Sequence, residues 1–332
     1  MISVVMPVYN GEKFLVLAVE SILAQTFRAF ELIVVDDGST DGTAVILNRF
    51  AKQDSRVRVI AGAHAGISDA LNRGIAAAKF DWIARMDGDD IAHPQRLEKQ
   101  WAAAQENPRV VAWGSYANHV NQQGRRLGLS KTGPTSEGEF HQWRRTGGEV
   151  TVIHPTAMFH KPTFLKAGGY DARFNGCEDF ELWDRIAEFG PIVAIPEPLL
   201  EYRVHATSVS MKKFFTMRRL ATFVIERHKA RLRGELLTYE EFEQREKSSG
   251  ILARLWWRVF HTSGFYYRNA GLAYGEGQHV KAARCLAAAW VLNPRYTTQR
   301  AWSQFVAPKV RRLIGAKAVP ASAPSAAPAV MT

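Results

Sequence analysis

The sequence predicts an α/β protein in which a mostly parallel sheet is flanked by helices and followed by a C-terminal helical extension. Short apolar runs rich in Val and Ile alternate with longer segments whose apolar residues recur at helical spacing. This alternation favours parallel strands covered by helices on both faces. Polar clusters follow several of the apolar runs, and ligand sites in such sheets lie beyond the carboxyl ends of the strands.

The expected elements alternate along residues 1–210. Asn10 is expected to cap the first helix, Ser68 to open the third and Pro94 to begin the fourth. Strands are expected at 2–6, 32–35, 57–60, 82–86 and 110–113, with further strands near 152–159, 192–195 and 199–202. Helices are expected at 14–25, 43–52, 69–79, 94–106 and 136–145, and another is expected to begin at Glu178.

Charge is distributed unevenly along the 332 residues. Of the 43 Lys and Arg and the 32 Asp and Glu, residues 211–332 contain 21 basic and 7 acidic residues. Residues 1–210 therefore have a balance of −3 and the remainder has a balance of +14. This shift predicts a domain at 1–210, a basic helical extension at 211–317 and a disordered Ala/Pro-rich tail at 318–332.

Cysteine usage and hydropathy indicate the expected cellular location of the protein. Cys177 and Cys285 lie far apart and fit neither a zinc motif nor a disulfide framework. The chain enters a strand at Ile2 without a signal-peptide pattern, and no uncharged run approaches the roughly 20 residues of a spanning helix. We therefore expect a cytoplasmic protein, with the inner face of the cell membrane as an option.

An apolar strand ends in a turn that carries three carboxylates, Asp87, Asp89 and Asp90. Neighbouring like charges repel, so packing alone does not explain the cluster. Asp-x-Asp offers two hard oxygen ligands on a turn that Gly88 allows, and Mg²⁺ or Mn²⁺ favours carboxylate oxygens. The alternative is a solvated acidic turn. Because other polar clusters also follow strands, we favour a divalent metal.

Four short motifs occur in order along the first part of the chain: Val5–Asn10, Val34–Asp41, Ala70–Gly74 and Met86–Asp90. In this order and spacing they resemble glycosyltransferase family 2. The resemblance covers about residues 1–210, and only the combination of the motifs is specific. It implies a GT-A fold, a nucleotide-sugar donor, a divalent metal and inversion at the anomeric carbon.

The resemblance implies a nucleotide-sugar site at the strand ends. Asp37 is expected to accept the N3–H of uracil, although an Asx turn or a helix cap would also explain it. Arg73 is expected to neutralise the diphosphate, against the alternative of a surface arginine. Asp87 is assigned to the ribose and the metal, and Asp89 to direct metal ligation. The loop expected to hold the nucleoside consists of Pro7, Val8, Tyr9 and Asn10.

The same resemblance implies a general base and a closing segment. Asp179, at the start of an amphipathic helix, is expected to take the proton of the acceptor hydroxyl. Stabilisation by the helix dipole is the alternative, and it would make Asp179 a weak base unless burial or a partner offset it. Arg203 and His205 are expected to close over the diphosphate and metal, or else to form an ordinary strand end and loop. His154 either lines the site or bonds to the backbone at a corner.

The C-terminal extension combines basic and aromatic residues. A basic amphipathic helix is expected within 212–233, and aromatic residues follow near Trp256 and Tyr266. This composition fits an anionic membrane surface, a nucleic acid or a helical cap on the catalytic domain. We favour a cap with peripheral membrane contact, and expect no nucleic-acid partner because no recognised binding module accompanies the charge.

The expected activity is transfer of a sugar from a UDP-linked donor to a glycan or lipid-linked acceptor in bacterial cell-surface polysaccharide synthesis. One rival is a nucleotidyltransferase, which usually has a Gly-rich, basic phosphate loop after its first strand. Here that turn is Pro7–Asn10, which argues against it. The other rival is a non-catalytic scaffold whose basic tail recruits partners, and only donor turnover separates it from an enzyme.

Overall fold

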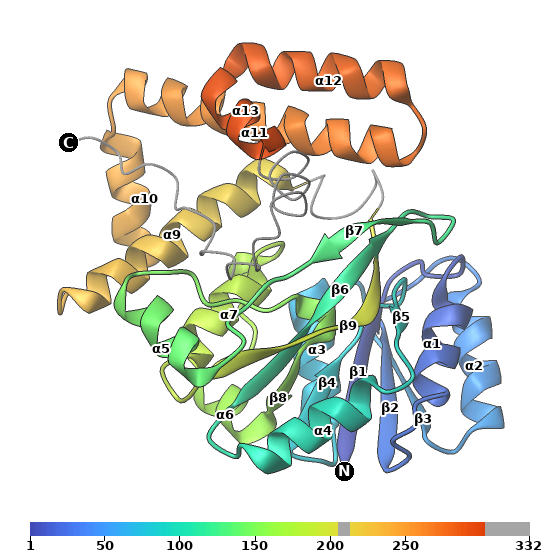
Figure 1. The fold of residues 1–332 in the computed structure, drawn as a ribbon. Coiled ribbons are helices and arrows are strands. Elements are labelled where there is room, and N and C mark those ends of the chain that lie inside the picture. Colours follow the sequence, from blue (N-terminus) through green and yellow to red (C-terminus); the bar gives the residue numbers. More distant parts are fainter. Residues whose placement is uncertain (205–212, 303–332) are drawn as a thin grey trace, which may run out of the picture. The chain divides into compact units, whose positions relative to one another are not determined.

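The computed structural model describes residues 1–204 and 213–302 (Figure 1). It contains two compact units, Met1–Arg203 and Val204–Thr332, and each is described by itself. The boundaries expected at residues 210 and 317 remain predictions, and the tail expected at 318–332 lies outside the described residues.

The first unit holds the strands and the shorter helices. Its strands are β1 Ile2–Val8, β2 Phe30–Asp36, β3 Val57–Ala61, β4 Trp82–Arg85, β5 Ile91–Ala92, β6 Ala112–Val120, β7 Arg126–Ser130, β8 Met158–His160 and β9 Ile192–Arg203. Its helices are α1 Leu15–Leu23, α2 Thr43–Gln53, α3 Ile67–Ala76, α4 Arg96–Glu106, α5 Glu137–Arg145, α6 Lys161–Lys166 and α7 Glu178–Ile186, with 3-10 turns at His154–Thr156 and Ala172–Phe174.

In the described residues, all strands join one sheet in the order β3-β2-β1-β4-β8-β6-β9-β5, and β7 pairs with β6. The pairs β1–β2, β1–β4, β2–β3 and β6–β9 are parallel. The pairs made by β5, β7 and β8 are antiparallel. The α/β fold class is confirmed. The sheet is parallel from β3 to β4 and mixed beyond β4.

Alternating residues of the parallel strands pack into two apolar layers. In β1, Val4 and Met6 join the layer that includes Leu15 of α1, whereas Val5 joins the layer that includes Leu71 of α3. The sheet is therefore buried on both faces. This burial explains why the strands appear in the sequence as continuous apolar runs.

Several expected boundaries differ from the structure. Helix α1 begins at Leu15, so Asn10 does not cap it, and α3 begins at Ile67 after Gly66. Helix α4 begins at Arg96, two residues after Pro94. The strand expected near 152–159 is mostly a 3-10 turn followed by the short β8. The two strands expected at 192–195 and 199–202 form one strand, β9, whose register shifts near Pro198.

The second unit is helical in its described part. Its helices are α9 Phe214–Leu232, α10 Tyr239–Ser248, α11 Ile251–Gly275, α12 His279–Leu292 and α13 Pro294–Ala301. Helices α11 and α12 pack together, and the Ser263 hydroxyl donates to the Ala289 carbonyl over 2.9 Å. No helix in the described ranges has both the length and the apolar character needed to cross a bilayer.

Candidate active site

The candidate site lies where β1, β2 and β4 end. The Asp37 amide donates to the Val8 carbonyl over 2.8 Å, and the Met86 amide donates to the Val5 carbonyl over 3.1 Å. These bonds continue the parallel ladders beyond the strands. They bring the loops after all three strands to one edge of the sheet, as the sequence predicted from the polar clusters.

The loops after β1 and β2 are joined through Asn10. Its amide donates to Ser39 Oγ over 2.9 Å, and its side-chain Oδ1 accepts from the Thr40 amide over 2.8 Å. Asn10 has a φ of 50°, a left-handed conformation that Asn tolerates better than most residues. A second bond, from the Gly11 amide to Thr43 Oγ1, strengthens the junction. Asn10 therefore shapes the loop that was expected to hold the nucleoside.

Tyr9 presents an aromatic surface beside this junction. Its side chain is 47% exposed and stacks on His64, with the ring centroids 3.9 Å apart and the planes at 28°. His64 Nδ1 lies 3.4 Å from Asp37 Oδ2. His64 was not among the predicted site residues, because it lies in none of the sequence motifs. Pro7 and Val8 belong to β1 itself and are buried, so Tyr9 and Asn10 are the accessible part of the expected nucleoside loop.

Asp37 is buried, and both oxygens of its carboxylate accept hydrogen bonds. Oδ1 accepts from the Ala65 amide over 3.0 Å, and Oδ2 accepts from the Gly66 amide over 2.8 Å. Arg73 Nη2 also donates to Oδ1 over 3.1 Å. Asp37 thus holds the segment that enters α3, and the Asx turn belongs to Asp36, whose Oδ1 accepts from the Ser39 amide. Recognition of a base by Asp37 remains a prediction, and it requires the remaining lone pairs of these oxygens.

Arg73 lies between two carboxylates. Its Nε is 2.6 Å from Asp69 Oδ2, one helical turn away, and its Nη2 contacts Asp37. Its guanidinium packs so closely against Gly62 that a Cβ there would clash with it. The side chain is partly exposed at the strand edge. Its expected action on a diphosphate remains a prediction. A diphosphate would have to compete with Asp37 and Asp69 for the guanidinium.

The acidic turn after β4 gathers three carboxylates. Oxygen atoms of Asp87, Asp89 and Asp90 lie within 4.8 Å of one another. Burial, followed by the neighbouring carboxylates, raises the pKa of Asp90 well above its usual range. Burial also raises the pKa of Asp87, against the opposing effect of Arg85, whose Nη1 donates to Asp87 Oδ2 over 2.5 Å. The turn therefore brings carboxylates together where burial and mutual repulsion disfavour their charged forms.

The donor set of this turn fits a divalent cation. Asp90 is 1% exposed, and its Oδ2 has no hydrogen-bond partner within the described ranges. A buried acceptor without a partner is costly, and a bound cation would satisfy it. Three carboxylates also supply the hard oxygen ligands that Mg²⁺ or Mn²⁺ prefers. Asp90 therefore joins Asp87 and Asp89 as a candidate ligand.

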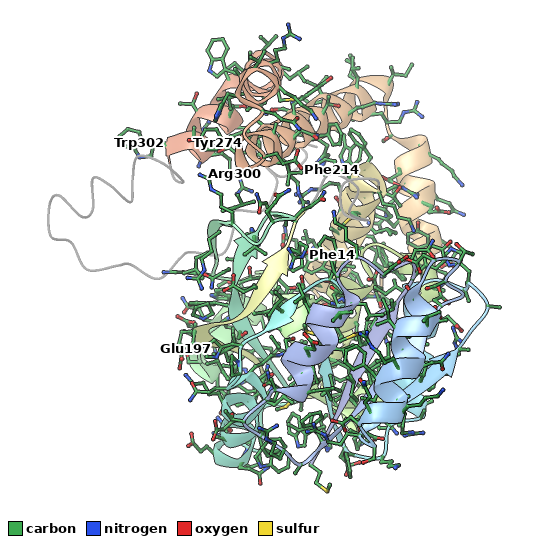
Figure 2. All side chains as sticks on the ribbon, turned by 90° about the vertical axis from the view of Figure 1, so that its right-hand side faces the viewer. Phe14, Glu197, Phe214, Tyr274, Arg300 and Trp302 are labelled. Carbon is green, nitrogen blue, oxygen red and sulfur yellow. The ribbon has the colours of Figure 1, made fainter. Side chains whose placement is uncertain are left out.

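Arg203, the last residue of β9, holds this turn in place. Its amide donates to Asp90 Oδ1 over 2.7 Å, and its Nε donates to the Asp89 carbonyl over 2.8 Å. Its Nη1 reaches the carbonyls of the loop after β6, and its guanidinium lies 4.4 Å from the ring centroid of Phe14, labelled in Figure 2. These bonds orient the turn, and contact of Arg203 with a diphosphate remains a prediction. His205 lies outside the described residues.

Asp179 and its neighbour Glu178 begin α7. The Asp179 Oδ1 accepts from the Phe180 amide over 2.8 Å. Burial raises the pKa of Asp179 despite the opposing effects of this bond and of the Arg85 charge. Burial, with the adjacent Asp179 charge, raises the pKa of Glu178 to about 7. Burial thus supplies the offset that a base at a helix start requires. The Asp179 charge also raises the pKa of Asp87, so the base candidate lies within electrostatic range of the acidic turn.

His154 is buried and contacts Tyr170, with 2.7 Å between His154 Nε2 and the Tyr170 hydroxyl. Burial and the nearby Arg85 charge lower its pKa well below the usual range. The alternative of a histidine bonded to backbone is therefore replaced by a bond between side chains. The predicted place of His154 in the lining of the site remains a prediction.

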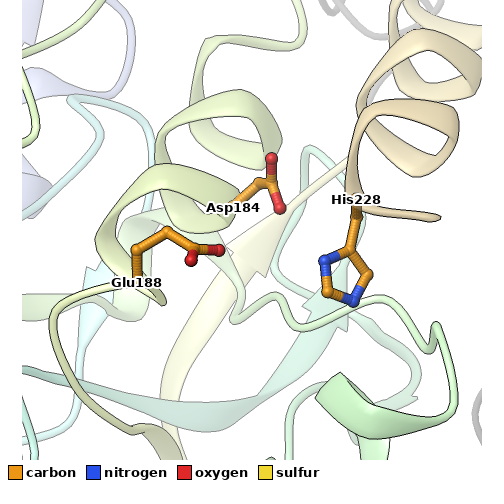
Figure 3. Close-up of side chains that lie close together, drawn as sticks. All are labelled: Asp184, Glu188 and His228. Atoms are coloured by element: carbon orange, nitrogen blue, oxygen red, sulfur yellow. The ribbon is translucent and has the colours of Figure 1, made fainter. Parts of the chain in front are cut away.

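Two further carboxylates occur at the end of α7 (Figure 3). Arg144 of α5 donates to Asp184 Oδ1 over 3.1 Å and also to Glu188. These ion pairs lie within the first unit and join two helices. His228, also labelled in Figure 3, belongs to α9 of the second unit. We assign none of these residues to the site.

Solved structures first define the class of protein. S. aureus TarS in complex with UDP-GlcNAc has a TM-score of 0.56 at 16% identity, with 90% of this chain and 92% of that chain covered. Mannosyltransferase PcManGT from Pyrobaculum calidifontis, solved with GDP-Man and Mn²⁺, has a TM-score of 0.55 at 16% identity, with 95% and 88% covered. At this identity the likeness establishes the fold, which is the GT-A fold of glycosyltransferases.

Sequence relatives then define the family. Residues 3–166 match "Glycosyl transferase family 2". O-antigen biosynthesis glycosyltransferase WbnJ of Escherichia coli is 31% identical over 68% of this chain and 92% of its own length. Amylovoran biosynthesis glycosyltransferase AmsE of Erwinia amylovora is 32% identical over 64% of this chain and 80% of its length. The chain belongs to glycosyltransferase family 2, which decides against a nucleotidyltransferase.

Proposed function

We propose that this protein is an inverting, metal-dependent glycosyltransferase that uses a UDP-linked sugar. The observation that carries the proposal is the gathering of three carboxylates, of which Asp90 is buried and Asp87 and Asp89 are half-buried, at one edge of the sheet. The base candidate Asp179 lies within electrostatic range of Asp87 in this acidic turn. Packing offers no reason to place these groups together, whereas a cation and a transferred sugar do.

The roles follow from the positions of the side chains. Asp89 and Asp90, with Asp87, would hold Mg²⁺ or Mn²⁺, which supplies Lewis-acid stabilisation to the leaving diphosphate when bound. Tyr9 offers a stacking surface for the base beside Asn10. Arg73 is the cation nearest the Asp37 side of the site and is assigned to the diphosphate. Arg203 orients the metal turn through the Asp89 carbonyl.

The chemical step is a single displacement at the anomeric carbon. Asp179 accepts the proton of the acceptor hydroxyl while the acceptor oxygen forms a bond to that carbon. The bond from the carbon to the diphosphate oxygen breaks, and the nucleoside diphosphate leaves with the electron pair. Attack from the opposite face inverts the configuration. The raised pKa of Asp179 improves its match to this proton transfer at neutral pH.

The acceptor is proposed to be a glycan or a lipid-linked glycan of bacterial surface polysaccharide. The relatives WbnJ and AmsE are named for O-antigen and amylovoran biosynthesis. The decisive experiment is a screen of nucleotide-sugars with Mn²⁺ or Mg²⁺, measuring donor hydrolysis and thermal shift. Metal-dependent turnover of a UDP-sugar is expected. Absence of turnover and of any shift with every donor would favour the non-catalytic scaffold.

The second unit is proposed to contact an anionic membrane, where lipid-linked acceptors reside. The start of α11 exposes Ile251, Leu252 and Trp256, with Leu252 81% exposed, beside Arg254 and Arg258. Exposed apolar side chains flanked by arginines suit the interface of an anionic bilayer. Figure 2 labels two further exposed aromatic side chains, Tyr274 and Trp302.

Vesicle sedimentation tests this contact with the full chain. Serine replacements at Ile251, Leu252 and Trp256 together should reduce binding to phosphatidylserine-containing vesicles at least severalfold. Vesicles of phosphatidylcholine alone serve as the control for charge. Equal binding by the variant and the unchanged protein would reject this surface.

A further inference from the structure

A buried arginine is bonded to Asp87 of the acidic turn and lies within electrostatic range of Glu178 and Asp179. Arg85 is the last residue of β4 and is 2% exposed. Its backbone is fixed from both sides, because its amide donates to the Ala157 carbonyl over 2.8 Å and its carbonyl accepts from Arg96 Nη2 over 2.6 Å. The position of the guanidinium is therefore a property of the sheet and not of a loop.

The guanidinium of Arg85 is only partly satisfied by hydrogen bonds. Nη1 donates to Asp87 Oδ2 over 2.5 Å, whereas Nε is buried without an acceptor in the parts of the chain that the structure describes. Burying an incompletely bonded guanidinium is costly. The surrounding charges offset this cost, since Asp87, Glu178 and Asp179 all lie within electrostatic reach of it.

The acidic turn is thus partly neutralised before any metal arrives. Arg85 is bonded to Asp87, and the charge of the buried Arg96 also acts on Asp87 and Asp90. A divalent cation bound by this turn would meet the Arg85 charge at close range in a poorly solvated place, where repulsion is strong. The diphosphate of a donor brings negative charges that would offset the repulsion.

We propose that Arg85 acts as an internal cation that competes with the divalent metal for Asp87, so that the acidic turn binds the metal tightly only together with a nucleoside diphosphate. This inference rests on the proposed metal site at Asp87–Asp90. Under this inference Arg85 controls how tightly the metal binds to Asp87, which a purely structural ion pair would not do. A structural role predicts that removing the arginine weakens the site, whereas competition predicts that metal binding without nucleotide becomes stronger.

The test measures Mn²⁺ binding to the full chain by the paramagnetic resonance signal of free Mn²⁺, at pH 8 to limit competition from protons. Arg85→Met removes the charge while keeping much of the side-chain length, and Arg85→Lys keeps the charge. Without nucleotide, the methionine variant should bind Mn²⁺ at least about tenfold more tightly than the unchanged protein. The lysine variant should stay close to the unchanged protein. Addition of UDP should tighten binding strongly in the unchanged protein and less in the methionine variant.

Three outcomes are distinguishable. Unchanged or weaker Mn²⁺ binding by a methionine variant that melts within a few degrees of the unchanged protein overturns the inference. If Arg85→Met does not fold, the unchanged protein decides the question, because tight Mn²⁺ binding without UDP also overturns the inference. Failure of every form to bind Mn²⁺, even with UDP, rejects the metal site itself and with it the proposed function.

Discussion

Two acidic turns, one after β2 and one after β4, lie at the same edge of the sheet. Their carboxylates differ in how many hydrogen bonds they accept from the protein. Asp37, after β2, accepts hydrogen bonds from two backbone amides and from Arg73, and both of its oxygens are used. The turn after β4 keeps Asp87, Asp89 and Asp90 together and leaves a buried oxygen of Asp90 without a hydrogen bond from the described residues. The difference separates a carboxylate that holds two loops together from a cluster that keeps one buried acceptor unbonded.

The largest expected effect comes from the chemistry beside the second turn. Asp89→Ala should remove the metal and Asp179→Asn should remove the base, and each should lower transfer by about 10³-fold. Steady-state transfer assays, with melting temperatures as the check on folding, measure this. Glu178→Gln is the matched control, because it alters the adjacent carboxyl and should cost about tenfold or less. Wild-type rates in Asp89→Ala or Asp179→Asn would contradict the assigned roles.

The pH dependence of stability tests how strongly burial raises the pKa of Glu178. The pKa of Glu178 is raised from 4.5 to about 7 in the folded protein. The folded state therefore holds a proton that the unfolded chain releases, so the stabilisation is complete below about pH 4.5 and is lost as the pH rises through about 7. This difference corresponds to at most on the order of 3 kcal/mol.

Thermal unfolding of the unchanged protein should accordingly show a melting temperature that falls between pH 5.5 and pH 8. Glu178→Gln should flatten this fall and be the more stable form at pH 8. The exposed Glu106→Gln is the control and should leave the profile unchanged. Parallel profiles for Glu178→Gln and the unchanged protein would show that Glu178 does not titrate in this range.

The smallest expected effect compares the two turns directly. Asp37→Asn loses acceptors for backbone amides and should lower the free energy of unfolding by about 1–3 kcal/mol. Asp90→Asn relieves repulsion and should leave that free energy unchanged or raise it slightly at pH 8. Urea unfolding of both variants provides the comparison. Equal destabilisation by the two substitutions would remove the distinction between the turns.

The sequence predicted the alternating strands and helices of the parallel part of the sheet. Apolar runs such as Ile2–Met6 predicted the parallel strands because both faces of the sheet are buried. The polar clusters predicted the edge where Asp37, Asp87 and Asn10 meet, because parallel strands end together. The direction of β8 was not predictable, since periodicity carries no information about which way a strand enters the sheet.

The finer details of the site depend on residues that arrive from distant segments. The backbone of Arg85 is held by Ala157, which lies far along the chain, and by Arg96 of α4, and arginine is ordinarily exposed. The stacking of His64 on Tyr9 and the bond from Thr40 to Asn10 join different loops. No local pattern encodes such contacts, so a sequence could nominate Asp37 for the nucleotide without revealing that its oxygens are already occupied.

The bonds of Arg203 have a practical consequence for truncation. One side chain at the end of β9 connects the Asp89 carbonyl, the loop after β6 and the ring of Phe14. A shortened protein that stops before this residue would release the backbone of the acidic turn Asp87–Asp90 even though every acidic side chain were retained. A minimal catalytic fragment therefore has to extend through residue 203, and activity lost on trimming further back would report a loosened turn and not a missing ligand.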